Sequence, residues 1–452
     1  MRIAELAGQR VAIWGFGREG RAAIHALRKR IPELPLALYC NETEAAEAQA
    51  FDAALRIYPS EPDAVALSAY DVVIKSPGIS AYKPAIVTAQ AQGTRFTSGT
   101  ALWFAENPQA RVIAVTGTKG KSTTTALIAH LARASGVRTA LAGNIGLPLL
   151  ELLDQHADLW AIELSSFQTG EAGPLDLGVI TSLYEEHLDW HGSRDRYVAD
   201  KLKLADHARR LLVNAQQPSL LEKTAGHAQR LLFGNVEGWH VAEGFIRRDD
   251  MGVFPLPRIA VPGAHNALNA CAALAALEAM GIDAIGAAQG LASFQPLPHR
   301  LQPLGDRDGL QWINDSISTT PQATLAALES LHDREVTVIV GGHDRGLDWT
   351  LFVDAVKSRT ALRVVTQGAN GPRIAMALRA AKSEVPMGDV DKLGDAVEMA
   401  RIITPADGIV LLSPGAPSFD QFHDYAERGR RFAALAGFDE QAIAGIEGLG
   451  IA

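Results

Sequence analysis

The chain has 452 residues, which is too many for one ordinary hydrophobic core, and about three domains are expected for this length. Hydrophobic residues make up 47% and charged residues 21%, and the net charge is −9. This charge, without any block of Lys or Arg, argues against non-specific binding to nucleic acids. No apolar stretch is long enough to span a membrane, and the first residues lack a signal-peptide pattern. With only two cysteines, these features predict a cytoplasmic protein that has no nucleic-acid or membrane partner.

Strand-like apolar runs alternate with helical patterns along most of the chain, which predicts an α/β fold with mainly parallel sheets. A polar, proline-containing stretch at 105–110 is typical of a linker, and the segment around LPHRLQ indicates a second boundary. We therefore expect three α/β domains at 1–107, 108–298 and 299–452.

The first motif in the chain is GFGREG, with Gly15, Gly17 and Gly20 between a strand-like run and a helical pattern. This arrangement is typical of a dinucleotide-binding turn. The acidic residue expected at the end of the next strand is absent, because LALYC is followed by Asn41. A nicotinamide cofactor is therefore disfavoured. The diphosphate of a UDP-sugar is compatible with the same turn, and a turn needed only for packing is the remaining alternative.

The run VIAVTGTKGKSTTTALIAHLA at 112–132 predicts a strand, a phosphate-binding loop and a helix. Lys121 would reach the terminal phosphates of a nucleotide, and the Ser122 hydroxyl could bind Mg²⁺. Val115 stands where the strict P-loop pattern has glycine, so the loop is a shorter variant; a plain turn with surface lysines is the alternative. The residues expected to hold the nucleotide are Gly117, Thr118, Lys119, Gly120, Lys121, Ser122 and Thr123.

Carboxylate, histidine and lysine side chains follow in the next segments. AIELSSF places Glu163 at the end of a buried-looking strand, where a charge needs a partner such as a metal ion; a helix-capping carboxylate is the alternative. The segment YEEHLDWHGSRDRYVADK contains His187, His191 and Lys201. A zinc site is disfavoured, because Gly192 argues against a helical pair of histidines and no cysteine lies near. Surface positions are the alternative for each of these side chains.

Later segments offer further polar residues at expected strand ends and helix starts. VPGAHNALNACAAL places Asn266 at a helix start, and LPHRLQ places Arg300 at a domain boundary. The segments NDSISTTP and SPGAPSFDQF each follow an apolar strand, where loops line the binding crevice of an α/β sheet. Taken separately, each of these segments is weak evidence for a site.

Taken together, the order and spacing of the segments resemble the Mur ligase family, whose ATP-dependent amide ligases build the peptide stem of peptidoglycan. The resemblance covers nearly the whole chain and rests on TGTKGKST, GNIGLP, ELSSFQ, EEHLDWHGS…YVADK, GAHNALN, LPHRLQ, NDS and LLSPGAPSFDQF…RG. It is strongest for the branch that adds glutamate to UDP-N-acetylmuramoyl-L-alanine. It implies a Rossmann-like domain for UDP, a central P-loop ATPase domain, and a Rossmann-like C-terminal domain for the amino acid.

The resemblance implies two chemical steps, with ATP and Mg²⁺ as cofactors. The substrate carboxylate attacks the γ-phosphate of ATP to give an acyl phosphate and ADP, and the amine of the amino acid then displaces phosphate. Lys121 would neutralise the β- and γ-phosphates. Ser122 and Glu163 would hold one Mg²⁺, and His187 would help to hold a second. Lys201 aligns with the lysine that is carbamylated in this family, and the carbamate could assist a metal site.

Further roles are implied by the same resemblance. Asn144 and His187 would orient the reacting end of the muramoyl substrate. Asn266, Arg300 and Asp315 would contact adenine, phosphate and ribose, respectively. The other residues expected to bind substrates are Gly15, Gly17, Arg18, Glu19, Ser76, Pro77, Gly78, Thr319, Arg345, Ser418, Phe419 and Tyr425.

Departures from the glutamate-adding pattern cluster around the expected acceptor pocket. Ile317 stands in place of a lysine, and Arg345 replaces another lysine, which changes a point charge into a planar fork. Gly415 and Pro417 alter the late loop, and Tyr425 replaces a phenylalanine. The ATP motifs are nearly intact, so the pattern favours an altered acceptor. A subgroup of the family joins L-glutamate, and we therefore expect L-glutamate, with D-glutamate as the alternative.

Other classes of protein are compatible with parts of the sequence. An oxidoreductase would use GFGREG but would leave the second loop unexplained. A ligase like folylpolyglutamate synthase shares the ATPase segment but normally begins at it. A non-catalytic nucleotide-binding regulator would not need Lys121, Glu163, His187 and Lys201 together. A monomer is expected.

Overall fold

The computed structural model describes residues 1–183, 194–261, 263–295, 297–441, 443 and 449–452. The chain falls into two compact units. The first contains residues 1–260, 265–294 and 448–452, and the second contains 261–264 and 295–447. The expected α/β class with mainly parallel sheets is confirmed. Within the described residues, no helix is both long and apolar enough to cross a bilayer.

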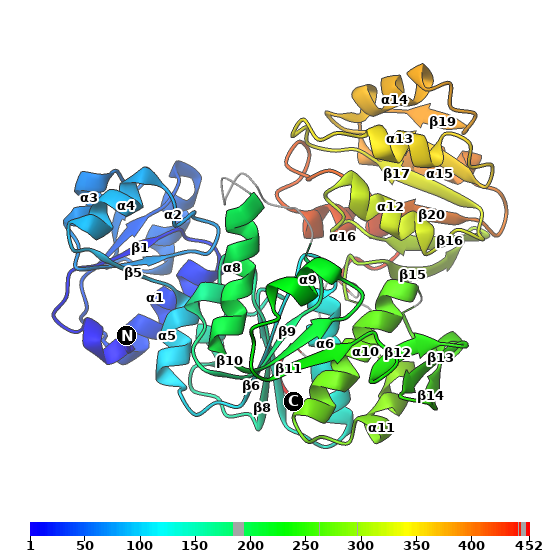
Figure 1. The fold of residues 1–452 in the computed structure, drawn as a ribbon. Helices are drawn as coiled ribbons and strands as arrows, with labels where there is room; N and C mark the ends of the chain where they lie inside the picture. The colour runs from blue at the N-terminus through cyan, green and yellow to red at the C-terminus, as the bar shows by residue number, and fades with distance from the viewer. Residues whose placement is uncertain (184–193, 262, 296, 442, 444–448) are drawn as a thin grey trace. The chain divides into compact units, whose positions relative to one another are not determined.

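The amino-terminal part of the first unit is a five-stranded parallel sheet in the order β3-β2-β1-β4-β5 (Figure 1). This is a Rossmann-like order, in which the chain reverses direction beside β1 and leaves a crevice there. The strands are β1 (Val11–Trp14), β2 (Leu36–Tyr39), β3 (Arg56–Tyr58), β4 (Val72–Lys75) and β5 (Arg95–Thr97). The helices are η1 (Ile3–Leu6), α1 (Arg18–Arg30), α2 (Glu42–Phe51), α3 (Ala64–Ser68), α4 (Pro84–Ala91) and α5 (Gly99–Glu106).

The second sheet of this unit has the order β11-β10-β9-β6-β8-β7-β21 and is parallel except for β21. Its strands are β6 (Val112–Thr116), β7 (Thr139–Gly143), β8 (Leu159–Glu163), β9 (Leu175–Ile180), β10 (Ala208–Asn214), β11 (Arg230–Phe233) and β21 (Gly450–Ile451). Strand β6 is buried along its whole length, which explains its continuous apolar run. Because β6 lies in the middle of the sheet, the loop after it lies at the centre of the sheet's carboxyl edge.

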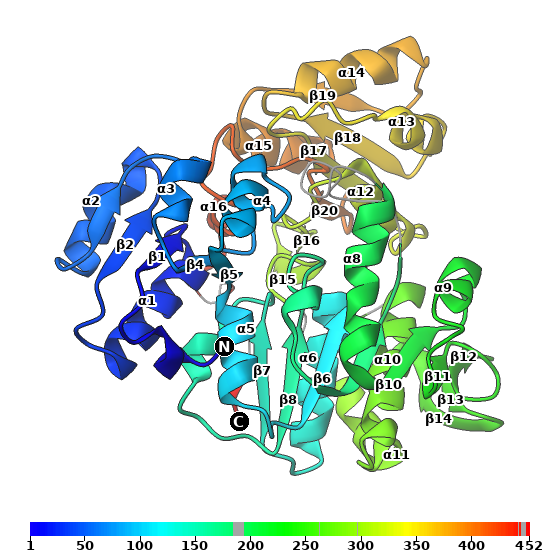
Figure 2. The ribbon, with the colours of Figure 1, turned by 60° about the vertical axis from the view of Figure 1, so that its left-hand side comes forward.

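Helices cover this central sheet and tie it to the first one. Helix α6 packs on β6 and β8, and α8 packs on β9 and β10 (Figure 2). The Trp103 ring of α5 lies 4.6 Å from that of Trp160 in β8, within a core shared by both sheets. The helices are α6 (Lys121–Ala134), η2 (Leu149–Leu152), η3 (Thr169–Glu171), α8 (Arg194–His207), α9 (Pro218–Lys223), η4 (Leu256–Arg258), α10 (Ala264–Ala279), α11 (Ala284–Ala287) and η5 (Ala288–Ala292).

A small antiparallel sheet between β11 and α10 was not expected from the sequence. Its strands are β12 (Trp239–Ala242), β13 (Phe245–Arg248) and β14 (Met251–Pro255). They are short, and their exposed positions include Phe245, Met251 and Gly252, so the continuous buried apolar runs that mark the parallel strands are absent here.

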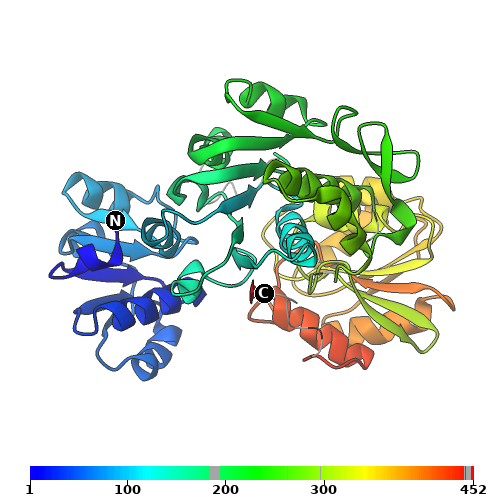
Figure 3. The ribbon, with the colours of Figure 1, turned by 90° about the horizontal axis from the view of Figure 1, so that it is seen from below.

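The second unit contains a six-stranded sheet in the order β15-β16-β20-β17-β18-β19, in which only the β15–β16 pair is antiparallel. Alternate residues of β17 belong to opposite cores: Val338 packs in a cluster with residues of α12, α13 and α14, whereas Ile339 packs in a cluster with residues of α15 and α16. Figure 3 shows helices on both faces of this sheet. The strands are β15 (Gln302–Arg307), β16 (Leu310–Asn314), β17 (Val336–Val340), β18 (Leu362–Thr366), β19 (Met387–Asp389) and β20 (Ile409–Leu412). The helices are α12 (Pro321–Glu329), α13 (Thr350–Val356), α14 (Gly371–Ala380), α15 (Leu393–Ile403) and α16 (Tyr425–Ala436).

The division of the chain at 107 and 298 stays a prediction. The two large sheets of the first unit and the sheet that begins at β15 follow the expected order of segments. The end of the chain behaves differently from the expectation, because β21 pairs with β7 of the central sheet rather than with any strand of the second unit.

Candidate active site

The predicted phosphate loop begins directly after β6 and is shaped by two glycines. Gly117 has a φ of +148° and Gly120 a φ of +83°, conformations that side chains disfavour. A Cβ atom on Gly117 would lie 2.1 Å from Thr181 Oγ1, and one on Gly120 would lie 2.4 Å from Asn269 Oδ1. Both positions therefore need glycine for conformation and for space. Asn269 from α10 lies against the loop.

The end of strand β9 holds the backbone of the loop in place. Thr118 N donates to Ser182 O at 2.9 Å, and Lys119 N donates to Ser182 Oγ at 2.7 Å. Lys121 is the first residue of α6, and its Nζ donates to Thr118 O at 3.0 Å. The ammonium group therefore curves over the loop, beside the first turn of a 14-residue helix. Ammonium and helix N-terminus together favour an anion at this point.

Helix α8 brings the predicted Lys201 to the same loop. The Lys201 side chain is buried, and its Nζ donates to Gly117 O at 2.8 Å. It also lies 4.9 Å from the centre of the Tyr197 ring. The Tyr197 hydroxyl is 2.8 Å from Thr118 Oγ1. Two residues one turn apart on α8 thus contact consecutive residues of the phosphate loop.

A buried carboxylate lies at the end of the neighbouring strand β8. Glu163 is 1% exposed, and its Oε1 accepts from Asn144 Nδ2 at 2.8 Å. Its Oε2 is buried and has no hydrogen-bond partner among the residues that the structure describes. Strand β8 pairs with β6 so that Glu163 lies beside Val115, next to the loop. The structure thus brings Glu163 beside Asn144 and next to the loop, and the roles predicted for these residues stay untested.

The donor set at this edge fits Mg²⁺. Proteins usually bind this ion through one or two carboxylates and the phosphates of the substrate, and the unsatisfied oxygen of Glu163 is such a ligand. Ser122, on the first turn of α6, offers a hydroxyl. Within the described part of the chain, no group of three or more His, Cys, Asp or Glu side chains could hold a metal ion. His187, predicted as a further ligand, lies outside the described residues.

The GFGREG turn follows β1 at the crevice of the amino-terminal sheet. A Cβ atom on Gly15 would lie 2.5 Å from Ser76 Oγ, and one on Gly20 would lie 2.0 Å from Gly15 O. Packing alone therefore explains these two glycines. A Cβ atom on Gly17 would have nothing within 4 Å, so packing does not explain this glycine. A backbone that opens to space at a helix start can approach a diphosphate closely.

The next two residues point toward the central segment of the same unit. Arg18 donates from its guanidinium to Gly146 O at 2.8 Å. The Glu19 carboxylate lies against Gly99 at the start of α5. Burial, and then the neighbouring Glu171 carboxylate, raise the pKa of Glu19 to about 7, against the opposing effect of Arg18. The predicted contact of Glu19 with substrate stays untested, and the structure gives this side chain a packing position.

Replacing Glu19 with glutamine is expected to stabilise the protein increasingly as pH rises. The wild-type carboxyl is harder to ionise when folded, so its ionisation lowers stability between its ordinary pKa of 4.5 and the folded value of about 7. Above that window the variant should gain at most about 3 kcal/mol in unfolding free energy. Denaturant unfolding across pH measures this difference. Glu47→Gln, at an exposed carboxylate paired with Arg21, should show no such gain; a flat Glu19→Gln profile would contradict the argument.

In the second unit, Asp315 follows β16 and is fully engaged with protein groups. Its Oδ2 accepts from Ser318 Oγ at 2.6 Å and from Ser413 Oγ at 2.7 Å. Its Oδ1 accepts from Leu301 N at 3.1 Å. Burial raises the pKa of Asp315, and these hydrogen bonds oppose that shift. The carboxylate therefore ties three segments together, and its predicted contact with ribose stays untested.

The predicted acceptor residues lie at the carboxyl edge of the same sheet. The Arg345 guanidinium is 5.6 Å from the centre of the Phe419 ring, and the His343 ring is 6.1 Å from it. Phe419 is 58% exposed, whereas the neighbouring Ser418 is buried. Tyr425 is the first residue of α16. The loops after β17 and β20 thus bring Arg345 and Phe419 together, and their predicted contacts with the acceptor stay untested.

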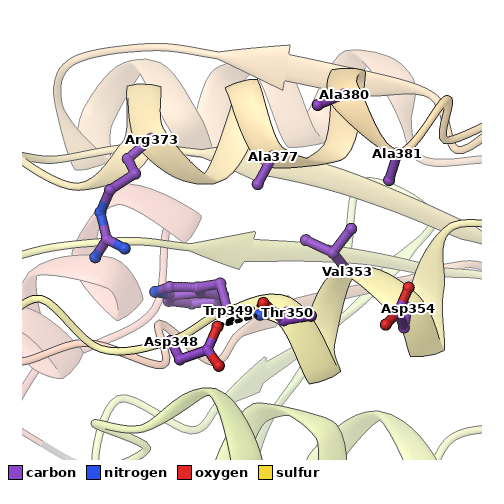
Figure 4. Close-up of a pocket in the computed structure, with 9 residues that line it drawn as sticks. All are labelled: Asp348, Trp349, Thr350, Val353, Asp354, Arg373, Ala377, Ala380 and Ala381. Carbon is purple, nitrogen blue, oxygen red and sulfur yellow. Dashed lines mark hydrogen bonds between the residues drawn. The ribbon is translucent and has the colours of Figure 1, made fainter.

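A separate cavity of about 400 Å³ lies between α13 and α14 of the second unit (Figure 4). It is lined by Asp348, Trp349, Thr350, Val353, Asp354, Arg373, Ala377, Ala380 and Ala381. None of these residues was predicted for the site, and the lining is largely apolar. This cavity is therefore not the candidate active site.

Two contacts of the phosphate loop were missed by sequence reasoning. Ser182 lies two residues after β9, and its position at the carboxyl edge next to β6 could have indicated it. Tyr197 lies four residues before Lys201 on a helix, a spacing that places both on one face. Neither residue type is specific enough to be selected without the fold.

The fold and this loop define a multi-domain α/β protein with a P-loop-type phosphate site. Residues 115–277 match the Mur ligase middle domain, and residues 299–415 match the family described as "Mur ligase, glutamate ligase domain". The chain therefore belongs to the Mur ligase family, as two curated relatives also show.

Both relatives are named UDP-N-acetylmuramoyl-L-alanine--L-glutamate ligase. The protein from Xanthomonas euvesicatoria pv. vesicatoria (strain 85-10) is 50% identical over 468 residues, covering 100% of each chain. That from Xylella fastidiosa (strain Temecula1 / ATCC 700964) is 49% identical with the same coverage. Among solved structures, the UDP-N-acetylmuramate-alanine ligase MurC of Thermotoga maritima aligns with a TM-score of 0.61 and 21% identity. That alignment covers 94% of this chain and 98% of the MurC chain, and it shows a shared fold.

Proposed function

We propose that this protein is an ATP-dependent ligase that joins L-glutamate to UDP-N-acetylmuramoyl-L-alanine during synthesis of peptidoglycan precursors. The observation that carries this proposal is the 50% identity, along the full length of both chains, to a relative named for that reaction. The phosphate loop with Lys121, Glu163 and Lys201 around it supports the ATP-dependent step. A nicotinamide-dependent oxidoreductase would leave these residues without a role.

The first step of the proposed reaction transfers the γ-phosphoryl group of ATP to the carboxylate of the muramoyl substrate. The amides of the loop and the Lys121 ammonium would bind the phosphates, and they favour the charge that develops in transfer. Mg²⁺, held by Ser122 and Glu163 with His187 at a second ion, would neutralise phosphate charge. Asn144, fixed by its bond to Glu163, would orient the reacting carboxylate.

In this proposal, Lys201 is modified to a carbamate. Its buried ammonium donates to the carbonyl of Gly117. Reaction of the neutral amine with carbon dioxide would form an N–C bond, release a proton and leave a carbamate anion. Such an anion could assist the metal site, which an ammonium cannot do.

The second step would take place on the acceptor amino acid. Its amine would attack the carbonyl of the acyl phosphate, lose a proton and expel phosphate. Thr319, Arg345, Ser418, Phe419 and Tyr425 would hold the acceptor. The remaining contacts follow the family pattern. Gly15, Gly17, Arg18, Glu19, Ser76, Pro77 and Gly78 would hold the UDP end, and Asn266, Arg300 and Asp315 would hold adenine, phosphate and ribose.

The proposal also covers the organisation and location of the protein. We take the domains to be 1–107 for the UDP-substrate, 108–298 for ATP and 299–452 for the amino acid, except that the last strand, β21, pairs within the central sheet. The protein would act as a monomer. The reaction would occur in the cytoplasm, where ATP and nucleotide sugars are available.

Phosphate release with ATP, Mg²⁺ and UDP-N-acetylmuramoyl-L-alanine tests the proposal when L- and D-glutamate are compared side by side. We expect kcat/KM for L-glutamate to exceed that for D-glutamate by about a hundredfold, because the acceptor loops must match two carboxylates and an amine at once. Omission of the UDP-substrate is the control and should abolish release. Faster release with D-glutamate would keep the ligase but overturn the acceptor assignment. Release with neither isomer would contradict the proposed function.

A further inference from the structure

A buried arginine on α16 has no role in the reaction described so far. The Arg428 side chain is 1% exposed and makes three hydrogen bonds to neutral oxygens. Its Nε donates to Ser316 Oγ at 3.0 Å, one terminal nitrogen donates to Ser316 O at 2.8 Å, and the other donates to Pro417 O at 3.2 Å. No ion pair with a carboxylate is found for it in the part of the chain that the structure describes. The guanidinium therefore joins two loops directly.

The two loops follow neighbouring strands. Ser316 lies just after β16 and Pro417 after β20, and these strands pair in parallel. A third loop joins them, because His343 N, after β17, donates to the same Pro417 O at 2.8 Å. A Cβ atom on Gly342 would lie 2.3 Å from that oxygen and 3.0 Å from Arg428, so the backbones approach closely. Arg428 is thus the side chain on which the three loop ends converge.

Each of these loops carries predicted acceptor contacts close to the bonded atoms. Ser418 directly follows Pro417, and Thr319 lies three residues after Ser316. Ser316 Oγ also donates to Tyr425 O at 2.7 Å, which fixes the start of α16. A shift of either bonded loop would therefore move several acceptor contacts together.

Burying a guanidinium without a direct counter-ion is costly, and an apolar side chain would fill the same volume at lower cost. Burial lowers the pKa of Arg428 to about 9, while Asp420 and Asp315 act in the opposite direction. The group is therefore still charged at neutral pH. Unlike a lysine or leucine side chain, a guanidinium is a rigid planar fork that donates hydrogen bonds to several acceptors at once.

We propose that Arg428 is a positioning residue that sets the distance between the Ser316 and Pro417 loops and thereby determines affinity and selectivity for the acceptor amino acid. This inference rests on the proposed function and extends it to a residue that would not touch the substrate. The effect acts through backbone geometry, because the acceptors of Arg428 are two carbonyls and one hydroxyl.

Steady-state phosphate release in Arg428→Lys tests the role. A lysine has one donor centre and cannot hold both loops, so we expect the KM for L-glutamate to rise about tenfold or more. The KM for ATP should stay within about twofold, and the preference for L- over D-glutamate should fall. Ser316→Ala should change the same parameters by less, and the double variant should show non-additive effects.

Arg359→Lys is a matched control in the same unit. Arg359 also donates to backbone carbonyls, those of Leu328 in α12 and of Leu331 after it, but it precedes β18 and lies at the opposite edge of the sheet. Its KM for glutamate should be unchanged.

The outcomes separate the possibilities. If Arg428→Lys is poorly folded, Ser316→Ala carries the test. A lowered kcat with unchanged KM for glutamate and unchanged isomer preference in both variants would show a purely structural role and overturn the inference. Wild-type inactivity with both isomers would contradict the proposed function itself, and the inference with it.

Discussion

Replacing Lys121 with alanine is expected to lower the rate of phosphate release by about a thousandfold, while the protein stays folded. In the structure the Lys121 Nζ donates to Thr118 O, a carbonyl of its own loop, at 3.0 Å, beside the start of α6. Charge that develops during phosphoryl transfer is stabilised best by fixed donors in such a place. The Lys121 side chain is partly exposed, so losing its hydrogen bond to Thr118 O should change the unfolding free energy by about 1 kcal/mol.

Lys223→Ala is the control for this prediction. Lys223 ends α9 in the same unit and is exposed, so its removal should leave kcat and KM unchanged. Steady-state phosphate release and thermal unfolding are measured on both variants. If Lys121→Ala kept more than about a tenth of the wild-type rate, the loop would not be the site of phosphoryl transfer. A large loss of stability in Lys121→Ala would instead assign the lysine a structural role.

The phosphate loop shows which features of the site residue patterns can predict and which they cannot. The run before it and the small residues within it predicted the strand, the loop and the helix. The pattern could not show that Gly120 is packed against Asn269 Oδ1, because α10 lies far along the chain. Ser182 is likewise recognisable only when β9 is known to be the neighbour of β6. The local sequence pattern thus identified the loop, whereas the residues that hold the loop in place can be identified only from the order of the strands.

Arg428 belongs to the RG pair on which the resemblance partly rests, but sequence reasoning gave it no role in the site. Arg428 and Ser316 are 112 positions apart in the chain, and no rule of sequence spacing predicts that they make contact. Its neighbours carry the departures on which the acceptor prediction rests, notably Ile317 and Pro417. Those substitutions indicated where the acceptor pocket changes, but the distances between loops depend on packing. The small β12–β14 sheet was missed for a related reason, since its pairing is local but its apolar pattern is weak.

Replacing Glu163 with glutamine is expected to change activity and stability in opposite directions. Its Oε2 is buried without a hydrogen-bond partner among the described residues, so removing the charge removes a desolvation cost. Without Mg²⁺, the variant should gain about 1 kcal/mol in unfolding free energy. An amide is a poor Mg²⁺ ligand, so phosphate release should fall by about a hundredfold, and half-maximal rate should need about tenfold more Mg²⁺.

Asp176→Asn is the control, because it removes a carboxylate of the same sheet that is not expected to bind the metal ion. Asp176 lies at the amino end of β9, where it accepts from Val112 N at 3.0 Å and faces Arg209. Because its oxygens are partnered, the variant should lose up to about 1 kcal/mol of stability and keep the wild-type Mg²⁺ requirement. Mg²⁺ titrations of phosphate release and denaturant unfolding in chelator measure both effects. If Glu163→Gln instead loses stability and keeps the wild-type Mg²⁺ requirement, the carboxylate only binds Asn144 and is not a metal ligand. Only a metal ligand is expected to combine a loss of activity with a gain in stability.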